Sequence, residues 1–462
     1  MENNSLNENN EQLRRKQDEV TAGYAERESW IRTSVTFKMF SVAFLAIILL
    51  IPAFMIQMVI QDREYRRNDA VIEISSKWGN EQTLAGPILT VPYKAVVKDE
   101  AGNISNVTQY AHFLPDRLDV KGALQPEVRY RGIYEAVLYT GKLQFSGQFS
   151  FPNFDDWTIN KQDILWNKAF LSVGIPDMRG INEKIELSWN SQKILFEPGI
   201  ESPDVIASGV SVSTPLTAES KNEGFTFDFA MSLNGSERLK FLPLGKETTV
   251  ALSSPWKNPS FDGAFLPDER SIDATGFKAQ WKVLHLNRNF PQQWLGNGQN
   301  IQEAAFGVKL LTPIDEYQKT MRSSKYAIMF IFLTFLGFFF VEILNKMRIH
   351  PLQYLLVGAA LCVFYLLLIS LSEHIKFNPA YLVSTAATVV LITAYSSTIF
   401  RNKMLTISIC VTLLALYGFL YSLLQLQDYA LLMGSLGLFA ILAAVMYLSR
   451  NVDWYNIGKT KE

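Results

Sequence analysis

The sequence predicts a membrane protein with an α-helical body of six spans and a large extracytoplasmic β-rich, sandwich-like domain inserted between spans 1 and 2. Two observations predict this class. Six apolar runs are each long enough to cross about 30 Å of hydrocarbon as a helix. Between the first and second of them, roughly 250 residues have the short alternating pattern of strands. The formal net charge of −1 gives no reason to expect nucleic acid as a partner.

The chain begins with a polar segment and a first span. Residues 1–38 are rich in Asn, Glu and Arg and predict a disordered or loosely helical cytoplasmic tail. Residues 39–60 are apolar enough to cross a bilayer, and Pro52 is tolerated inside such a helix. The run is long and no small-x-small cleavage site follows it, so we interpret it as an uncleaved anchor.

Residues 61–326 contain no apolar span and predict the β-rich domain. Alternation is clear in "KIELSW" and "FTFDFAMSL", and turn signals such as "DEAGN" and "LNGS" separate the runs. We expect one β-sandwich or two smaller ones, and the sequence does not choose between them. Arg63 to about Lys77 is the exception, because it favours a helix that continues the first span outward.

The remaining apolar runs are joined by only a few residues, which predicts antiparallel neighbouring helices in a bundle over residues 327–448. The predicted spans are residues 327–344, 352–371, 379–399, 404–424 and 429–448. Basic residues gather in every second joint and in the tail at 449–462, so the positive-inside rule places both termini in the cytoplasm. In a bacterium, this orientation puts the β-rich domain in the periplasm.

Common catalytic signatures are absent. The sequence has no G-x-S-x-G elbow, no phosphate-binding loop and no H-E-x-x-H, and we expect no cofactor and no metal. Both cysteines, Cys362 and Cys410, lie in apolar runs. In the β-rich domain a carboxylate pair, or a carboxylate beside His112 or His285, remains open as an enzymatic site.

Four ionisable residues of the membrane body are candidates for function. Glu342 is followed by Lys346 at i+4, so an interfacial ion pair competes with a role toward a substrate or ion. His350 precedes Pro351, which favours a role in the turn.

Glu373 and His374 emerge at the other end of the same span. About twenty residues separate them from His350, or roughly 30 Å along a helix, so the two ends cannot form one site within that helix. Glu373 and His374 are adjacent, and a carboxylate can shift the pKa of a histidine. Each end of the span is interpreted first as an interfacial anchor, and if the span has a chemical role, Glu373 and His374 are the better pair for it.

Several long segments resemble the CreD family of bacterial inner-membrane proteins. They include "KMFSVAFLAIILLIPAFMIQMVIQDREYR", "RGIYEAVLYTG", "TGFKAQWKVLHLNRNFP", "RIHPLQYLLVGAALCVFYLLLISLSEH" and "RNVDWY", and the resemblance covers about residues 30–456. The resemblance implies the bacterial inner membrane and a part in cell-envelope integrity, with links to colicin tolerance, envelope stress and the β-lactam response. It also implies association with a two-component system. It brings no catalytic or binding residues with it.

Three hypotheses follow. The first is a non-enzymatic inner-membrane protein that supports envelope integrity or a stress response through its β-rich domain, with membrane lipid and periplasmic protein, lipid or cell-wall partners. Trp157, Trp256 and Trp294 would supply contact there, unless they pack in the core. The second is a transporter or lipid-handling protein that uses Glu342 and Glu373/His374. The third is an enzyme acting on an envelope substrate.

Overall fold

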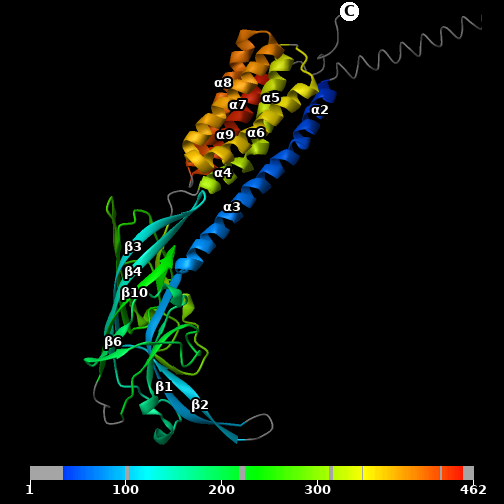
Figure 1. Ribbon diagram of the computed structural model, residues 1–462. Coiled ribbons are helices and arrows are strands. Elements are labelled where there is room, and N and C mark those ends of the chain that lie inside the picture. The colour runs from blue at the N-terminus through cyan, green and yellow to red at the C-terminus, as the bar shows by residue number, and fades with distance from the viewer. Residues whose placement is uncertain are drawn as a thin grey trace, which may run out of the picture. The chain divides into compact units, whose positions relative to one another are not determined.

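The computed structural model describes residues 35–98, 104–217, 224–311, 316–345, 347–426 and 429–450. The two predicted polar tails, 1–38 and 449–462, fall almost wholly outside these ranges. The chain divides into two compact units, one formed by Met1–Tyr65 with Asp315–Glu462 and the other by Arg66–Ile314. The first unit is helical and the second is built from strands (Figure 1).

Six helices within the described residues are long and apolar enough to cross a membrane, as the sequence predicts. The first of these is the continuous stretch Lys38–Trp78, and the others lie in the C-terminal part of the chain. The helices are α2 (Val35–Ile48), α3 (Leu50–Trp78), α4 (Glu316–Lys325), α5 (Ala327–Leu344), α6 (Pro351–Ile375), α7 (Phe377–Phe400), α8 (Lys403–Gln425) and α9 (Ala430–Ser449).

The junction of α2 and α3 follows from Pro52. Proline has no N–H, so the carbonyl of Ile48 loses its usual helical donor, and the helix is interrupted at Leu49. The chain nevertheless continues as a helix to Trp78, which confirms the helix expected over Arg63 to about Lys77.

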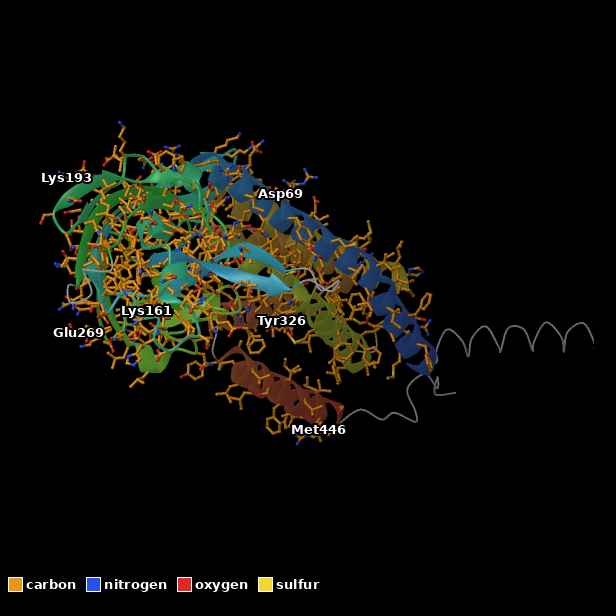
Figure 2. All side chains as sticks on the ribbon, turned by 90° about the horizontal axis from the view of Figure 1, so that it is seen from below. Asp69, Lys161, Lys193, Glu269, Tyr326 and Met446 are labelled. Atoms are coloured by element: carbon orange, nitrogen blue, oxygen red, sulfur yellow. The ribbon has the colours of Figure 1, made fainter. Side chains whose placement is uncertain are left out.

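The helical unit has an apolar core rich in aromatic rings. Phe364 packs its ring 4.7 Å from Tyr417 and 5.6 Å from Tyr381, joining α6, α7 and α8. Gly358 on α6 admits Leu49, since a Cβ at this glycine would overlap the Leu49 side chain. By contrast α9 has no buried residue, and Met446, labelled in Figure 2, is one of its many exposed apolar side chains, while Ile441 packs partly buried against the core. A helix that is apolar all round suits a lipid surrounding.

The strand-built unit contains two mixed sheets whose strand order crosses the sequence order repeatedly. Most neighbours are antiparallel, but β1 pairs with β11 and β12 with β3 in parallel. The nine-stranded sheet has the order β13 (Pro259–Gly263), β17 (Phe306–Leu310), β11 (Arg238–Phe241), β1 (Gln82–Lys98), β5 (Phe170–Gly174), β9 (Gly209–Ser213), β8 (Glu197–Pro198), with β2 (Ile104–Phe113) on β1 and β16 (Gln293–Leu295) on β2. The eight-stranded sheet has the order β14 (Glu269–Asp273), β15 (Gly276–Leu284), β12 (Glu247–Ser254), β3 (Arg117–Arg131), β4 (Tyr134–Phe149), β10 (Phe225–Ser236), β6 (Glu186–Trp189), β7 (Gln192–Leu195).

One hydrophobic core joins the two sheets, which answers the question of one sandwich or two. Phe145 of β4 lies 6.5 Å from Phe241 of β11, ring centre to ring centre. Trp281 of β15 lies 5.8 Å from Phe306 of β17. Each pair links the eight-stranded sheet to the nine-stranded sheet, and both belong to a single cluster of buried residues. The described strands therefore form one sandwich.

Candidate functional site

Glu342 is a buried carboxylate near the end of α5, with only 3 % of its surface exposed. Three donors surround it. The Lys38 ammonium and the backbone N–H of Ile349, at 3.0 Å, both donate to Oε1. The Tyr354 hydroxyl donates to Oε2 over 2.9 Å. The carboxylate is thereby satisfied by α2, by the turn after α5 and by α6, which ties these three segments together.

The partner expected for Glu342 was Lys346, which lies outside the described residues. Lys38 is 304 positions away in the sequence, so no local pattern points to it. Glu342 forms an ion pair as the sequence predicts, but with Lys38, and its donors join three separate segments of the helical unit.

His350 is the N-cap of α6, in agreement with its predicted role in the turn. Its Nδ1 accepts a hydrogen bond of 3.2 Å from the backbone N–H of Leu352. The backbone N–H of His350 in turn donates to the Gln353 side chain over 2.9 Å, and Pro351 occupies the first helical position. This reciprocal capping stabilises the start of the helix.

The structure does not bring Glu373 and His374 together. Successive residues on a helix point about 100° apart, and the two side chains reach different partners. Glu373, with 8 % of its side chain exposed, lies 3.8 Å from the Arg63 guanidinium of α3. His374 is exposed, and its Nδ1 lies 3.0 Å from the carbonyl oxygen of Ser370 one turn earlier. The two side chains therefore have different partners, and a functional role for the pair stays a prediction.

A hydroxyl, an imidazole and a carboxylate lie in line in the strand-built unit. Thr90 of β1 and His112 of β2 are directly opposite each other in the ladder, with Thr90 Oγ1 3.0 Å from His112 Nδ1. His112 Nε2 lies 3.4 Å from Asp204 Oδ2. A neutral ring protonated at Nε2 accepts from the threonine and donates to the carboxylate, which satisfies all three groups.

This alignment has the order of a catalytic triad but not its access. Thr90 is 2 % exposed and His112 is 1 % exposed, so a substrate carbonyl cannot reach the hydroxyl. Burial lowers the pKa of His112, while its contact with Asp204 opposes the shift. The carboxylate anticipated beside a histidine is present in Asp204, which lies in a turn with 23 % of its side chain exposed and makes a polar contact with the buried His112.

The tryptophans considered as contact residues belong mainly to the core. Trp294 is buried beside His112, with ring centres 5.7 Å apart. Trp157 and Trp256 are partly buried against the same cluster, and the Trp256 indole donates to the Leu311 carbonyl over 2.9 Å. Core packing, the alternative weighed for these side chains, accounts for Trp294, whereas Trp157 and Trp256 pack against the core and stay partly exposed.

An open depression lies on the exposed face of the eight-stranded sheet, over β14, β15, β12, β3 and β4, with a volume of about 730 Å³. Glu269 of β14, labelled in Figure 2, is one of its lining residues. We call this depression the lysine hollow and define it by six lining residues, namely Lys121, Ala123, Lys142, Ala251, Ser253 and Lys278. Sequence reasoning missed it, because its residues come from strands far apart in the chain.

Among the described residues, no group of three or more His, Cys, Asp or Glu side chains is arranged to hold a metal ion. The two cysteines are free thiols, Cys362 buried and Cys410 partly buried. Neither feature adds a candidate site to the ones above.

We expect Glu342→Leu to lower the free energy of unfolding by about 2–3 kcal/mol, because it leaves the Ile349 N–H and the Tyr354 hydroxyl without an acceptor and Lys38 without a counterion. Tyr354→Phe removes one donor and should cost about 1 kcal/mol. Thermal unfolding of the purified chain in detergent measures both. His374→Ala, an exposed control on α6, should change little. Equal stability of the Glu342→Leu and wild-type proteins would contradict the network.

We expect the strand-built unit to lose stability as pH falls below about 6.5, because the unfolded chain then binds a proton that buried His112 resists. The loss continues until pH reaches the lowered pKa of the folded state, with a slope of at most about 1.4 kcal/mol per pH unit. Thermal unfolding followed by tryptophan fluorescence at pH 7.5 and 5.5 measures it. His112→Gln should flatten this dependence, whereas His285→Gln, at an exposed position, should keep it. If the stability of His112→Gln still falls with pH as in the wild-type protein, other titratable groups cause the pH dependence.

Comparison with known proteins agrees with the architecture. A family model described as "Inner membrane protein CreD" matches residues 34–455. The chain is also 32 % identical over 437 residues to the Inner membrane protein CreD of Escherichia coli (strain K12), covering 93 % of this chain and 96 % of that relative. Together with six membrane-capable helices, these matches show a multi-pass inner-membrane protein. The chain belongs to the CreD family.

Proposed function

We propose that this protein supports the integrity of the cell envelope as a non-enzymatic binding protein, with the membrane helices as its anchor and the strand-built unit as its binding part. The resemblance to the CreD family implies the envelope role. The single observation that carries the binding part is the lysine hollow, an open and cationic depression on a sheet face that the core does not use.

The proposed orientation places both termini in the cytoplasm and the strand-built unit in the periplasm. Arg348 lies in the joint between α5 and α6, and Arg401 and Lys403 lie at the joint between α7 and α8. The joint between α6 and α7 has Lys376 alone, so positive charge alternates with the spans as the positive-inside rule requires.

The membrane body offers less support for transport. A transport path needs ionisable groups that can change partners as the substrate passes. Glu342 is held by three donors, and His350 caps a helix. Glu373 lies beside Arg63 near the end of α6. These contacts favour anchoring over transport.

Catalysis at His112 is also poorly supported, because a substrate has no access to the groups there. The hydroxyl and the imidazole that could act together are both buried, whereas the exposed lysine hollow presents ammonium groups and small side chains. No observation on the described residues favours an enzyme over a binding protein.

An alkaline phosphatase fused after Gln125 should be active in whole cells, because the enzyme matures only outside the cytoplasm. A matched fusion after Arg450 should be inactive. Activity measured with a chromogenic phosphate ester distinguishes the two sides. The reverse pattern would place the strand-built unit in the cytosol and remove the basis for an envelope-facing role.

In a strain lacking the native gene, the charge-reversed variant Lys121→Glu/Lys142→Glu/Lys278→Glu should fail to restore growth in the presence of a detergent that challenges the envelope. The double variant Glu373→Gln/His374→Ala should restore it at normal protein abundance, because the proposal gives these residues an anchoring role. Protein levels are measured by immunoblot. The opposite result, with the hollow dispensable and the Glu373/His374 pair essential, would favour transport instead.

A further inference from the structure

The lysine hollow has a floor of small side chains because of the strand register. Ser253 of β12 pairs with Lys278 of β15 on one side and with Ala123 of β3 on the other. Ala123 in turn pairs with Lys142 of β4. One row across the sheet therefore reads lysine, serine, alanine, lysine, with long side chains at its ends and short ones between them.

The third lysine lies in the next row. Lys121 stands two residues before Ala123 on β3 and pairs with Ala251 of β12. Neighbouring strands are about 4.8 Å apart and residues on one face of a strand about 6.7 Å apart. Lys121 and Lys142 are then separated by about 8 Å at Cα, and Lys142 and Lys278 by about 14 Å. Flexible lysine side chains at such spacing can converge on one compact ligand.

The hollow has more cations than carboxylates. Its lining has three lysines against the carboxylate of Glu269, and Asp273 of the same edge strand interacts electrostatically with Lys278. Two other acids of the same sheet have cations of their own, since Asp119 pairs with Arg117 and Glu247 with Lys282. An anionic occupant is what this surface complements.

The shape of the hollow and its lining residues limit the kinds of ligand that can bind there. A volume of about 730 Å³ lies within the range of small-ligand sites. A flat bilayer surface or a folded acidic protein would not fill a depression of this kind. The floor carries Ser253, and Ser271 and Gln280 also line the hollow, so neutral hydrogen-bonding groups lie between the cations. Lys121 and Lys142 form one cationic position and Lys278 a second one about 14 Å from Lys142. Each position suits one phosphate group, which carries about −1.5 to −2 charge near neutral pH.

We propose that the lysine hollow binds a sugar that carries two phosphate groups, with the phosphates on the lysines and the sugar hydroxyls over the serine and glutamine side chains. This inference rests on the proposed function, because it names the ligand class of the same surface. It involves no covalent step.

Glucose 1,6-bisphosphate is the minimal probe, titrated into the purified full chain in detergent by isothermal calorimetry. We expect saturable binding that weakens as salt is raised. Lys121→Glu/Lys142→Glu/Lys278→Glu should raise Kd at least tenfold, and the milder Lys121→Gln/Lys142→Gln/Lys278→Gln provides the same measurement if charge reversal impairs folding. The matched control is Lys161→Glu/Lys184→Glu/Lys257→Glu, which makes the same charge change at exposed positions outside the hollow and should leave Kd unchanged.

Three results would overturn the inference. They are no binding up to 10 mM probe (an upper limit set on the order of weak ligand affinities), equal weakening by the control variant, and equally tight binding of glucose or of polyglutamate. Loss of envelope support in cells without binding of the bisphosphate would reject the ligand class and leave the binding function standing. If the bisphosphate binds but the charge-reversed variant still supports the envelope, the ligand class stands and the proposed envelope function of the hollow is rejected.

Discussion

Hydrocarbon offers no water to a backbone N–H or C=O, so a chain that crosses it must satisfy these groups within each segment. The long apolar helices of this protein meet that requirement, and the same constraint moves ionisable side chains to the helix ends. Glu342 lies two residues before Leu344, the last residue of α5, and Glu373 lies two residues before Ile375, the last of α6. A carboxylate at such a depth persists where donors surround it, which is what Lys38, Ile349 and Tyr354 provide for Glu342.

In the strand-built unit, successive side chains along a strand point to opposite faces of the sheet, so the residues that stabilise the core differ from those that could bind a ligand. Inward residues such as Val120 and Leu252 are buried in the common core, while their neighbours Lys121 and Ser253 face the hollow. A change to an outward residue leaves the packing between the sheets intact. The lysine hollow can therefore be altered without destroying the sandwich that supports it, and this separation makes it suitable as a binding surface.

Local patterns predicted what depends on neighbours in the chain. Apolar runs predicted the six membrane-capable helices, and His350 before Pro351 predicted a turn that leads into a helix. Contacts between distant segments were out of reach. Lys38 pairs with Glu342 across 304 positions in the sequence. Strands β12 and β3 form a parallel pair, and no turn motif in the sequence predicts their pairing. Glu373 and His374 are one step apart on α6, which turns their side chains about 100° from each other, and a functional role for the pair stays a prediction.

Solvent accessibility distinguishes the two candidate sites of the strand-built unit, the group around His112 and the lysine hollow. Thr90, His112 and Asp204 have the composition of a catalytic site, yet the first two are almost fully covered, and their hydrogen bonds already satisfy one another. The lysines of the hollow have the opposite properties, because they are exposed and outnumber the carboxylates of its lining. A buried group with matched partners contributes to folding, whereas an exposed set of like charges raises the free energy of the protein until an opposite charge arrives. That difference, more than residue type, directs the search for function to the face of the eight-stranded sheet.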